Sequence, residues 1–190
     1  RYTYPAGAKQ RQVLLRLDHA LPDGKVSDAE VTVHSEREVR GWLHSDGALS
    51  KRGGGFKLFF VLRSREPFQA GTWRDQKLYP KEKTQKSARI GVWMTFPEGK
   101  NPVEIQVGLS FVSIEGAQKN LSSERKGWDF EATQKATSDA WEALLSVVKV
   151  GGGTTEQRRI FYTALYHVLQ MPTILMDVDG LYRGLDGKVH

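Results

Sequence analysis

Cysteine is absent from this chain of 190 residues, and its absence removes several classes of chemistry. Without thiols there are no disulfides, no cysteine metal sites and no thiol nucleophile. The five histidines show no H-x-x-x-H or H-E-x-x-H spacing, so the sequence predicts no zinc site. The phosphate-binding patterns G-x-x-x-x-G-K-[ST] and G-x-G-x-x-G and the G-x-S-x-G serine elbow are missing too.

Long apolar runs are also missing. No stretch approaches the ~20 apolar residues that span a bilayer, and no signal peptide is visible at the start of the sequence. The first residue is Arg1 rather than methionine, so we expect it to mark a processing boundary. The composition predicts a globular protein with no membrane partner.

A modest excess of basic residues gives a net charge of +6. The densest basic stretch, "KLYPKEKTQKSAR" (residues 77–89), has no helical apolar period and matches none of the usual nucleic-acid-binding motifs. It is typical of a solvated loop, and we expect no nucleic-acid partner.

An apolar period of two dominates up to about residue 112. In "PVEIQVGLSF" the residues Val103, Ile105, Val107 and Leu109 alternate with polar or small residues, which predicts a strand with one apolar face. Turn sequences such as "LPDGK", "KRGGG" and "FPEGKNP" separate this run from "EVTVHSEREV", "FKLFFVLRS" and "RIGVWMTF". Several short strands without intervening helices predict an antiparallel β-sandwich. We expect its first strands to be missing from the sequence.

After residue 112 the apolar period becomes helical. Ser113 is placed to cap a short helix, and a second helix is expected from "GWDF" (residues 127–130) to about Val148. Thr154 and Gln157 have the spacing of a capping box that starts a third helix, which Pro172 is expected to end.

The last residues, "DVDGLYRGLDGKVH", hold most of the candidate chemistry. Asp177, Asp179 and Asp186 lie close to Arg183, but the pattern lacks the later ligands of an EF-hand loop. Two interpretations stay open. The Asp-Gly pairs suit hairpin turns, and a loop of carboxylates with a guanidinium also suits a hydroxyl-rich ligand.

Tryptophan is a further candidate for carbohydrate binding, because its ring suits the C–H face of a sugar. Most of the five tryptophans are expected in the core. Trp73 is the exception, since "QAGTWRDQ" predicts that it lies in a glycine-containing loop.

The segment "RIFYTALYHVLQMPTILMDVDGLYRGLDGKVH" resembles the start of the catalytic domain of glycoside hydrolase family 92, the calcium-dependent exo-acting α-mannosidases. The runs "VGLSFVSIEGAQKNLSSERKGWDF", "FFVLRSREPFQAGTW" and "GVWMTF" resemble preceding parts of the same family. These similarities cover nearly the whole chain in the expected order.

The resemblance implies a fold that is mainly β with α. We expect an antiparallel β-sandwich over residues 1–112, a helical spacer over residues 113–150, and the start of an (α/α)6 barrel over residues 151–190. Only the first barrel helix and its following loop would belong to this chain.

The resemblance also implies inverting hydrolysis of α-mannosides, in which one carboxylic acid protonates the leaving oxygen and a second carboxylate activates water. In the family these residues and the main calcium ligands come from later barrel segments, so we assign no catalytic and no metal-binding residue here. The expected partners are α-mannoside glycans, with α-1,2 bonds of N-glycans or mannans preferred, and the remainder of the barrel. Secretion, or location in the periplasm or at the cell surface, is the family expectation.

By the same resemblance, Asp177, Asp179, Arg183 and Trp73 are the predicted substrate-binding residues, with the aspartates accepting from sugar hydroxyls. Leu181 departs from the family pattern, which commonly has arginine there. The alternative is a non-catalytic carbohydrate-binding or structural β-sandwich module. The broad apolar face of residues 160–169 argues against it, because one isolated helix cannot bury such a face.

Overall fold

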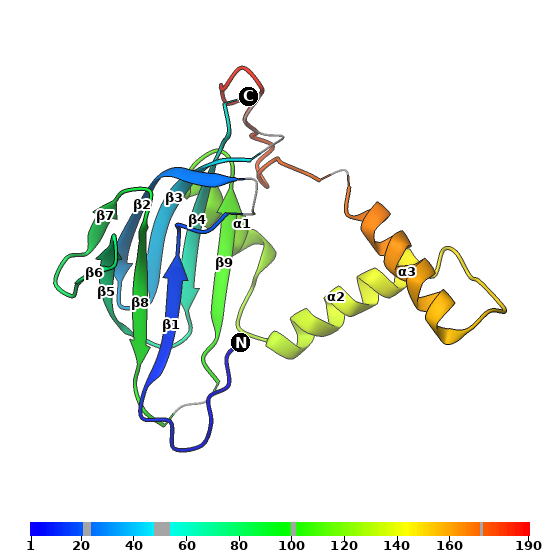
Figure 1. Ribbon diagram of the computed structural model, residues 1–190, viewed down its shortest axis with the longest axis horizontal. Coiled ribbons are helices and arrows are strands. Elements are labelled where there is room, and N and C mark those ends of the chain that lie inside the picture. The colour runs from blue at the N-terminus through cyan, green and yellow to red at the C-terminus, as the bar shows by residue number, and fades with distance from the viewer. Residues whose placement is uncertain (21–23, 48–53, 100–101, 172) are drawn as a thin grey trace. The chain divides into compact units, whose positions relative to one another are not determined.

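The computed structural model describes residues 1–20, 24–47, 54–99, 102–171 and 173–190 (Figure 1). The chain divides into two compact units. The first consists of Arg1–Trp128 together with Leu175–His190, and the second is Asp129–Ile174. The chain therefore leaves the first unit after Trp128 and returns to it at Leu175.

Two antiparallel sheets make up most of the first unit, as Figure 1 shows. The four-stranded sheet has the order β1 (Arg11–Arg16), β8 (Ile90–Phe96), β5 (Gln69–Arg74) and β6 (Lys77–Tyr79). The five-stranded sheet has the order β7 (Thr84–Lys86), β2 (Lys25–Ser35), β3 (Glu38–Asp46), β4 (Phe56–Ser64) and β9 (Ile105–Ser110). The predicted antiparallel sandwich is confirmed.

The core lies between the facing surfaces of the two sheets. Alternate side chains of the strands point into it, as the period of two predicts. Its fully buried members include Val31, Val39, Ile90, Val92 and Met94. Each such side chain contributes about 1.5–3 kcal/mol through removal from water, so this layer stabilises the unit.

A short helix, α1 (Ile114–Glu124), covers part of the outer face of the five-stranded sheet. Ser113 caps it by accepting the backbone N–H of Gly116, as predicted. Ala117 and Leu121 on its buried side pack against Val61 of β4 and form a second, smaller apolar cluster. The sheet is thus covered on both faces around β4.

Strand β9 departs from the burial that its sequence predicts. Val107 and Leu109 are 51% and 49% exposed, whereas Gly108 and Ser110 on the opposite face are buried. The reason is α1, which packs on the face with the smaller side chains. A Cβ at Gly108 would lie 2.3 Å from the carbonyl oxygen of Ala117, so glycine permits this close approach.

One further expectation changes. The basic stretch at residues 77–89 is not a plain loop, because it contains the short strands β6 and β7. Residues 21–23, 51–53 and 100–101 of the predicted turns, and Pro172 as the predicted helix stop, lie outside the described residues.

The second unit contains two helices, α2 (Phe130–Leu145) and α3 (Thr155–Leu169). The ring of Trp141 on α2 lies 4.5 Å from that of Tyr166 on α3, centroid to centroid. The predicted capping box of Thr154 and Gln157 is present at the start of α3. No described residue of either helix is buried, and His167 on α3 is exposed. None of the helices in the described residues has the length and apolar character needed to cross a membrane.

Candidate functional site

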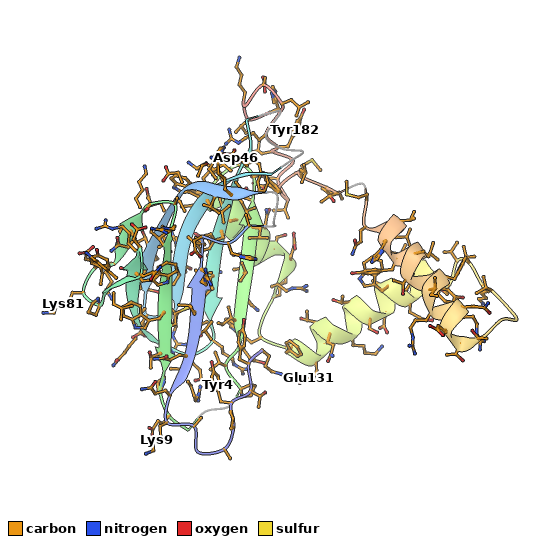
Figure 2. All side chains as sticks on the ribbon, viewed as in Figure 1. Tyr4, Lys9, Asp46, Lys81, Glu131 and Tyr182 are labelled. Carbon is orange, nitrogen blue, oxygen red and sulfur yellow. The ribbon has the colours of Figure 1, made fainter. Side chains whose placement is uncertain are left out.

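Residues 175–190, here called the terminal loop, fold back onto the first unit. Isolated β-bridges join Met176 to Tyr182 and Arg183 to Val189 within the loop. Gly180 and Gly187 have positive φ angles of 86° and 77°, which glycine adopts without strain. Both Asp-Gly pairs therefore stand at turns, as the turn-forming interpretation predicted. Figure 2 shows Tyr182 at the same end of the sandwich as Asp46, with Tyr4 and Lys9 at the opposite end.

Asp177 is buried, with 4% of its surface exposed. The Ser110 hydroxyl at the end of β9 donates to its Oδ2 over 2.7 Å. The Asn120 amide on α1 donates to its Oδ1 over 2.8 Å. A Cβ at Gly116 would lie 2.1 Å from Oδ2, so glycine leaves the space for this carboxylate. We call Ser110, Gly116 and Asn120 the Asp177 socket.

Asn120 makes two further hydrogen bonds in this socket. Besides its bond to Asp177, its Nδ2 donates to the carbonyl oxygen of Leu109 over 2.8 Å. Its Oδ1 accepts the backbone N–H of Val178 over 2.9 Å. One side chain thus connects β9, α1 and the terminal loop.

Asp179 lies at the surface, two residues further along. Lys119 of α1 donates to its Oδ2 over 2.8 Å, and the Asp179 side chain keeps 29% of its surface exposed. The Lys119 hydrogen bond, with the Leu181 backbone N–H as a second donor, lowers the pKa of Asp179. The carboxylate is therefore ionised and accessible at neutral pH.

Arg183 holds the loop through three backbone carbonyls. Its guanidinium donates to the oxygens of Phe111 at 3.0 Å, Val112 at 3.0 Å and Gly187 at 2.7 Å. These contacts join the loop to the connection between β9 and α1. They give Arg183 a structural role, distinct from a direct bond to either aspartate.

Asp186 forms a pair with the last residue of the chain. Its Oδ1 lies 3.1 Å from Nε2 of His190, and the His190 ring stacks on Tyr182 with centroids 5.5 Å apart. The Lys188 backbone N–H and then His190 lower the pKa of Asp186. Asp186 is thus a second ionised, exposed carboxylate of the terminal loop.

Trp73 does not lie in a loop, and this placement corrects the sequence prediction. It belongs to β5, where it pairs with Leu78 of β6 and Gly91 of β8. Its indole ring occupies the space over Gly91, at which a Cβ would meet Nε1 at 2.4 Å. Its indole N–H is buried without a hydrogen-bond partner among the described residues. Trp73 is therefore part of the four-stranded sheet, while the other three predicted site residues contact α1 or its junction with β9.

The residues that hold the loop are absent from the sequence prediction. Ser110 and Asn120 lie 67 and 57 residues before Asp177, and no local pattern marks them as its partners. The glycine at position 116, inside an otherwise good helix, is the one signal that could have indicated a close neighbour.

The described residues do not form a metal site between them. They contain no group of three or more histidine, aspartate or glutamate side chains that could hold an ion. The loop carboxylates instead bind Ser110, Asn120, Lys119 and His190. These residues do not fit a calcium site, and we derive no step through calcium.

Two family models identify the class of protein to which this sandwich and its docked loop belong. The glycosyl hydrolase family 92 N-terminal domain matches residues 1–110, and the catalytic domain of the same family matches residues 116–190. The chain belongs to glycosyl hydrolase family 92, as its resemblance implied.

Solved structures agree with this assignment. The GH92 family glycosyl hydrolase ccman5 is 27% identical, with a TM-score of 0.84 over 99% of this chain and 25% of its own. The family GH92 α-mannosidase BT3965 from Bacteroides thetaiotaomicron shares the fold at 20% identity, with a TM-score of 0.86 over 99% of this chain and 26% of its own. The predicted fold class is confirmed.

A sequence relative gives a shorter match. An uncharacterized secreted glycosidase of Arthroderma benhamiae is 32% identical over 91 residues, which are 44% of this chain and 12% of that protein. The chain thus spans about a quarter of the length of the solved structures and an eighth of this relative.

The predicted boundaries at residues 112 and 150 stay a prediction. The two family models meet between residues 110 and 116, and the compact units separate after Trp128. In the structure the terminal loop, predicted as part of the barrel, packs with the sandwich.

Proposed function

We propose that the protein carrying this chain is an exo-acting, inverting α-mannosidase, and that this chain supplies the sandwich and one wall of the mannose pocket. One observation carries the proposal. The terminal loop, which lies within the part of the chain that matches the catalytic domain, docks on the sandwich and presents the ionised carboxylates of Asp179 and Asp186. Structural relatives named as mannosidases support it: the α-mannosidase BT3965, also solved in complex with mannoimidazole, and the inverting mannosidase BT2199.

Within this pocket we propose different roles for the predicted residues. Asp179 is the carboxylate that accepts from mannose hydroxyls, because it is ionised and partly exposed. Asp177 has both oxygens bound by Ser110 and Asn120, so it acts through the position of the loop, as Arg183 does. A sugar contact by Trp73 stays a prediction from the sequence alone.

The chemistry that we propose needs groups beyond these. Inversion requires a carboxylic acid at the leaving oxygen and a carboxylate that activates water on the opposite face of the sugar. We place both, and the calcium ligands, outside this chain. Specificity for α-1,2 bonds of N-glycans or mannans, calcium dependence and secretion are further parts of the proposal, the last supported by the name of the secreted relative.

The test is mannose release from α-1,2-, α-1,3- and α-1,6-mannobiose by the complete protein, with and without a calcium chelator. We expect release from the α-1,2 isomer to be fastest and chelation to abolish it. Binding of mannobiose without release would favour the alternative, a carbohydrate-binding module. If the complete protein showed no binding of mannobiose and no release of mannose, the proposal would be refuted.

Asp179→Asn tests the site itself. A hydrogen bond to a charged group contributes about 1.5–3 kcal/mol, so kcat/KM should fall by about 10- to 100-fold. Asp139→Asn is the matched control, because Asp139 pairs with Lys135 at 2.6 Å on the exposed face of α2. It should leave kcat/KM unchanged. If the two variants lowered kcat/KM equally, Asp179 would not be a sugar-binding residue of the pocket.

A further inference from the structure

The terminal loop is held in place by a helix that belongs to the sandwich. Two consecutive residues of α1 contact two aspartates of the loop. Lys119 pairs with Asp179, and Asn120 donates to Asp177. Lys119 is 59% exposed, so water and salt screen its ion pair. The less exposed Asn120 is the stronger candidate for fixing the loop.

The chemistry of Asn120 is specific to an amide. Its Nδ2 donates twice, to a Leu109 carbonyl oxygen and to the Asp177 carboxylate, and its Oδ1 accepts the Val178 N–H. A carboxylate at this position would keep only the bond to Val178 and would face Asp177 with a like charge. An alanine would lose all three bonds.

The contacts lead directly to the ligand-facing residue. Val178, whose N–H Asn120 accepts, precedes Asp179 in the chain. Two backbone hydrogen bonds close the turn from Asp177 to Leu181. The Asp177 N–H donates to the Leu181 oxygen over 2.8 Å, and the Gly180 N–H donates to the Asp177 oxygen over 2.9 Å. Asp179 therefore stands inside a tight turn whose first residue is fixed by the socket.

We infer that Asn120 is a positioning residue of the mannose pocket: it fixes the turn from Asp177 to Leu181 and thereby sets where the Asp179 carboxylate meets the sugar. This inference rests on the proposed function for its sugar-binding consequence. The anchoring of the loop stands on the hydrogen bonds alone, so the two parts can be tested separately.

The first arm measures anchoring in the complete protein by amide hydrogen exchange. Asn120→Asp should speed exchange in peptides covering the terminal loop by at least about tenfold, because two bonds are lost and like charges meet. Peptides from β3 and β8 should exchange as in the wild type, which shows that the variant is folded. Asn120→Ala replaces Asn120→Asp if the added charge prevents folding.

Gln118→Glu is the charge-matched control, since it makes the same amide-to-carboxylate change on the same helix. It should leave exchange of the terminal loop unchanged. Loop exchange in Asn120→Asp equal to that of this control would overturn the inference, whatever the protein hydrolyses.

The second arm uses mannobiose kinetics. Loss of position should raise KM by about tenfold or more, while kcat changes little, because a displaced Asp179 weakens ground-state and transition-state binding alike. Faster loop exchange with unchanged KM and kcat would overturn the positioning role. Absence of hydrolysis in the wild type would refute the proposed function and the pocket role together, and the exchange arm would still decide the anchoring.

A reciprocal variant separates positioning from general damage. Asn120→Asp combined with Asp177→Asn restores an amide facing a carboxylate and keeps an acceptor for the Val178 N–H. It loses only the bond to the Leu109 oxygen. We expect loop exchange and KM to return at least halfway, on a logarithmic scale, from Asn120→Asp to the wild type. A double variant no better than Asn120→Asp would overturn the inference.

Discussion

Gly116 gives the sharpest prediction, because its missing side chain is what admits the Asp177 carboxylate. A Cβ there would lie 2.1 Å from Oδ2 of Asp177 and 2.7 Å from Oγ of Ser110. Real contacts of a carbon with either oxygen need more than 3 Å, so Gly116→Ala forces the carboxylate away. The terminal loop should then undock, while α1 keeps its Ser113 cap.

The magnitude follows from two costs that add. Overpacking costs about 1–3 kcal/mol, and separating Ser110 from Asp177 adds about 1–3 kcal/mol for buried groups left without partners. Alanine favours the helix by about 1 kcal/mol over glycine. That gain exists whether the loop is docked or free, so it does not offset the loss of docking. A net cost of about 2 kcal/mol or more corresponds to a rise of about 30-fold in the undocked population.

Amide hydrogen exchange of peptides covering residues 175–190 measures this population. Gly151→Ala is the matched control, since a Cβ at Gly151 meets no atom within 4 Å, and it should exchange as the wild type does. If Gly116→Ala also exchanged at the wild-type rate, the socket would not be what holds the loop, and the steric reasoning would be wrong.

Two further predictions concern the same end of the sandwich. Gly108→Ala places a Cβ 2.3 Å from the Ala117 oxygen, so denaturant unfolding should show a loss of about 1–3 kcal/mol. An unchanged midpoint would contradict the packing of α1 on β9. Lys119 lowers the pKa of Asp179, so their pair stabilises docking above the ordinary carboxyl pKa of about 4 and is lost as pH falls below it. Loop exchange, corrected for its intrinsic pH dependence, should therefore rise below about pH 4 in the wild type and rise less in Lys119→Met, where the Leu181 N–H still lowers the pKa of Asp179 and the Lys188 N–H and His190 lower that of Asp186. Parallel pH profiles of the two proteins would exclude this ion pair as the cause.

The sequence predicted the sandwich because alternation of apolar residues is a local signal. It predicted the caps at Ser113 and Thr154 for the same reason. The same signal misassigned the buried face of β9 at Gly108 and Ser110, because the docking of α1 on that face is a tertiary event. Trp73 was placed in a loop because Gly71 suggested a turn, whereas the structure uses that glycine within β5.

The site was predictable only in part. The cluster of Asp177, Asp179 and Arg183 is visible in the sequence, since its members lie within seven residues of one another. What each does depends on partners far away in the chain. Asn120 and Ser110 turn Asp177 into an anchor and leave Asp179 as the accessible carboxylate, and no periodicity connects residues that are 57 and 67 positions apart.

The return of the chain to the sandwich also sets an order of events during synthesis. The socket is complete in sequence once α1 has been made, but Asp177 follows Asn120 by 57 residues. At about 5–20 residues per second, translation separates the two by about 3–11 s. During that interval the Ser110 hydroxyl and the Asn120 amide bind water in place of the carboxylate. The nascent sandwich therefore exposes two hydrogen-bond donors, Ser110 and Asn120, until the terminal loop has been made. The length of that interval is set by the rate of translation rather than by the fold.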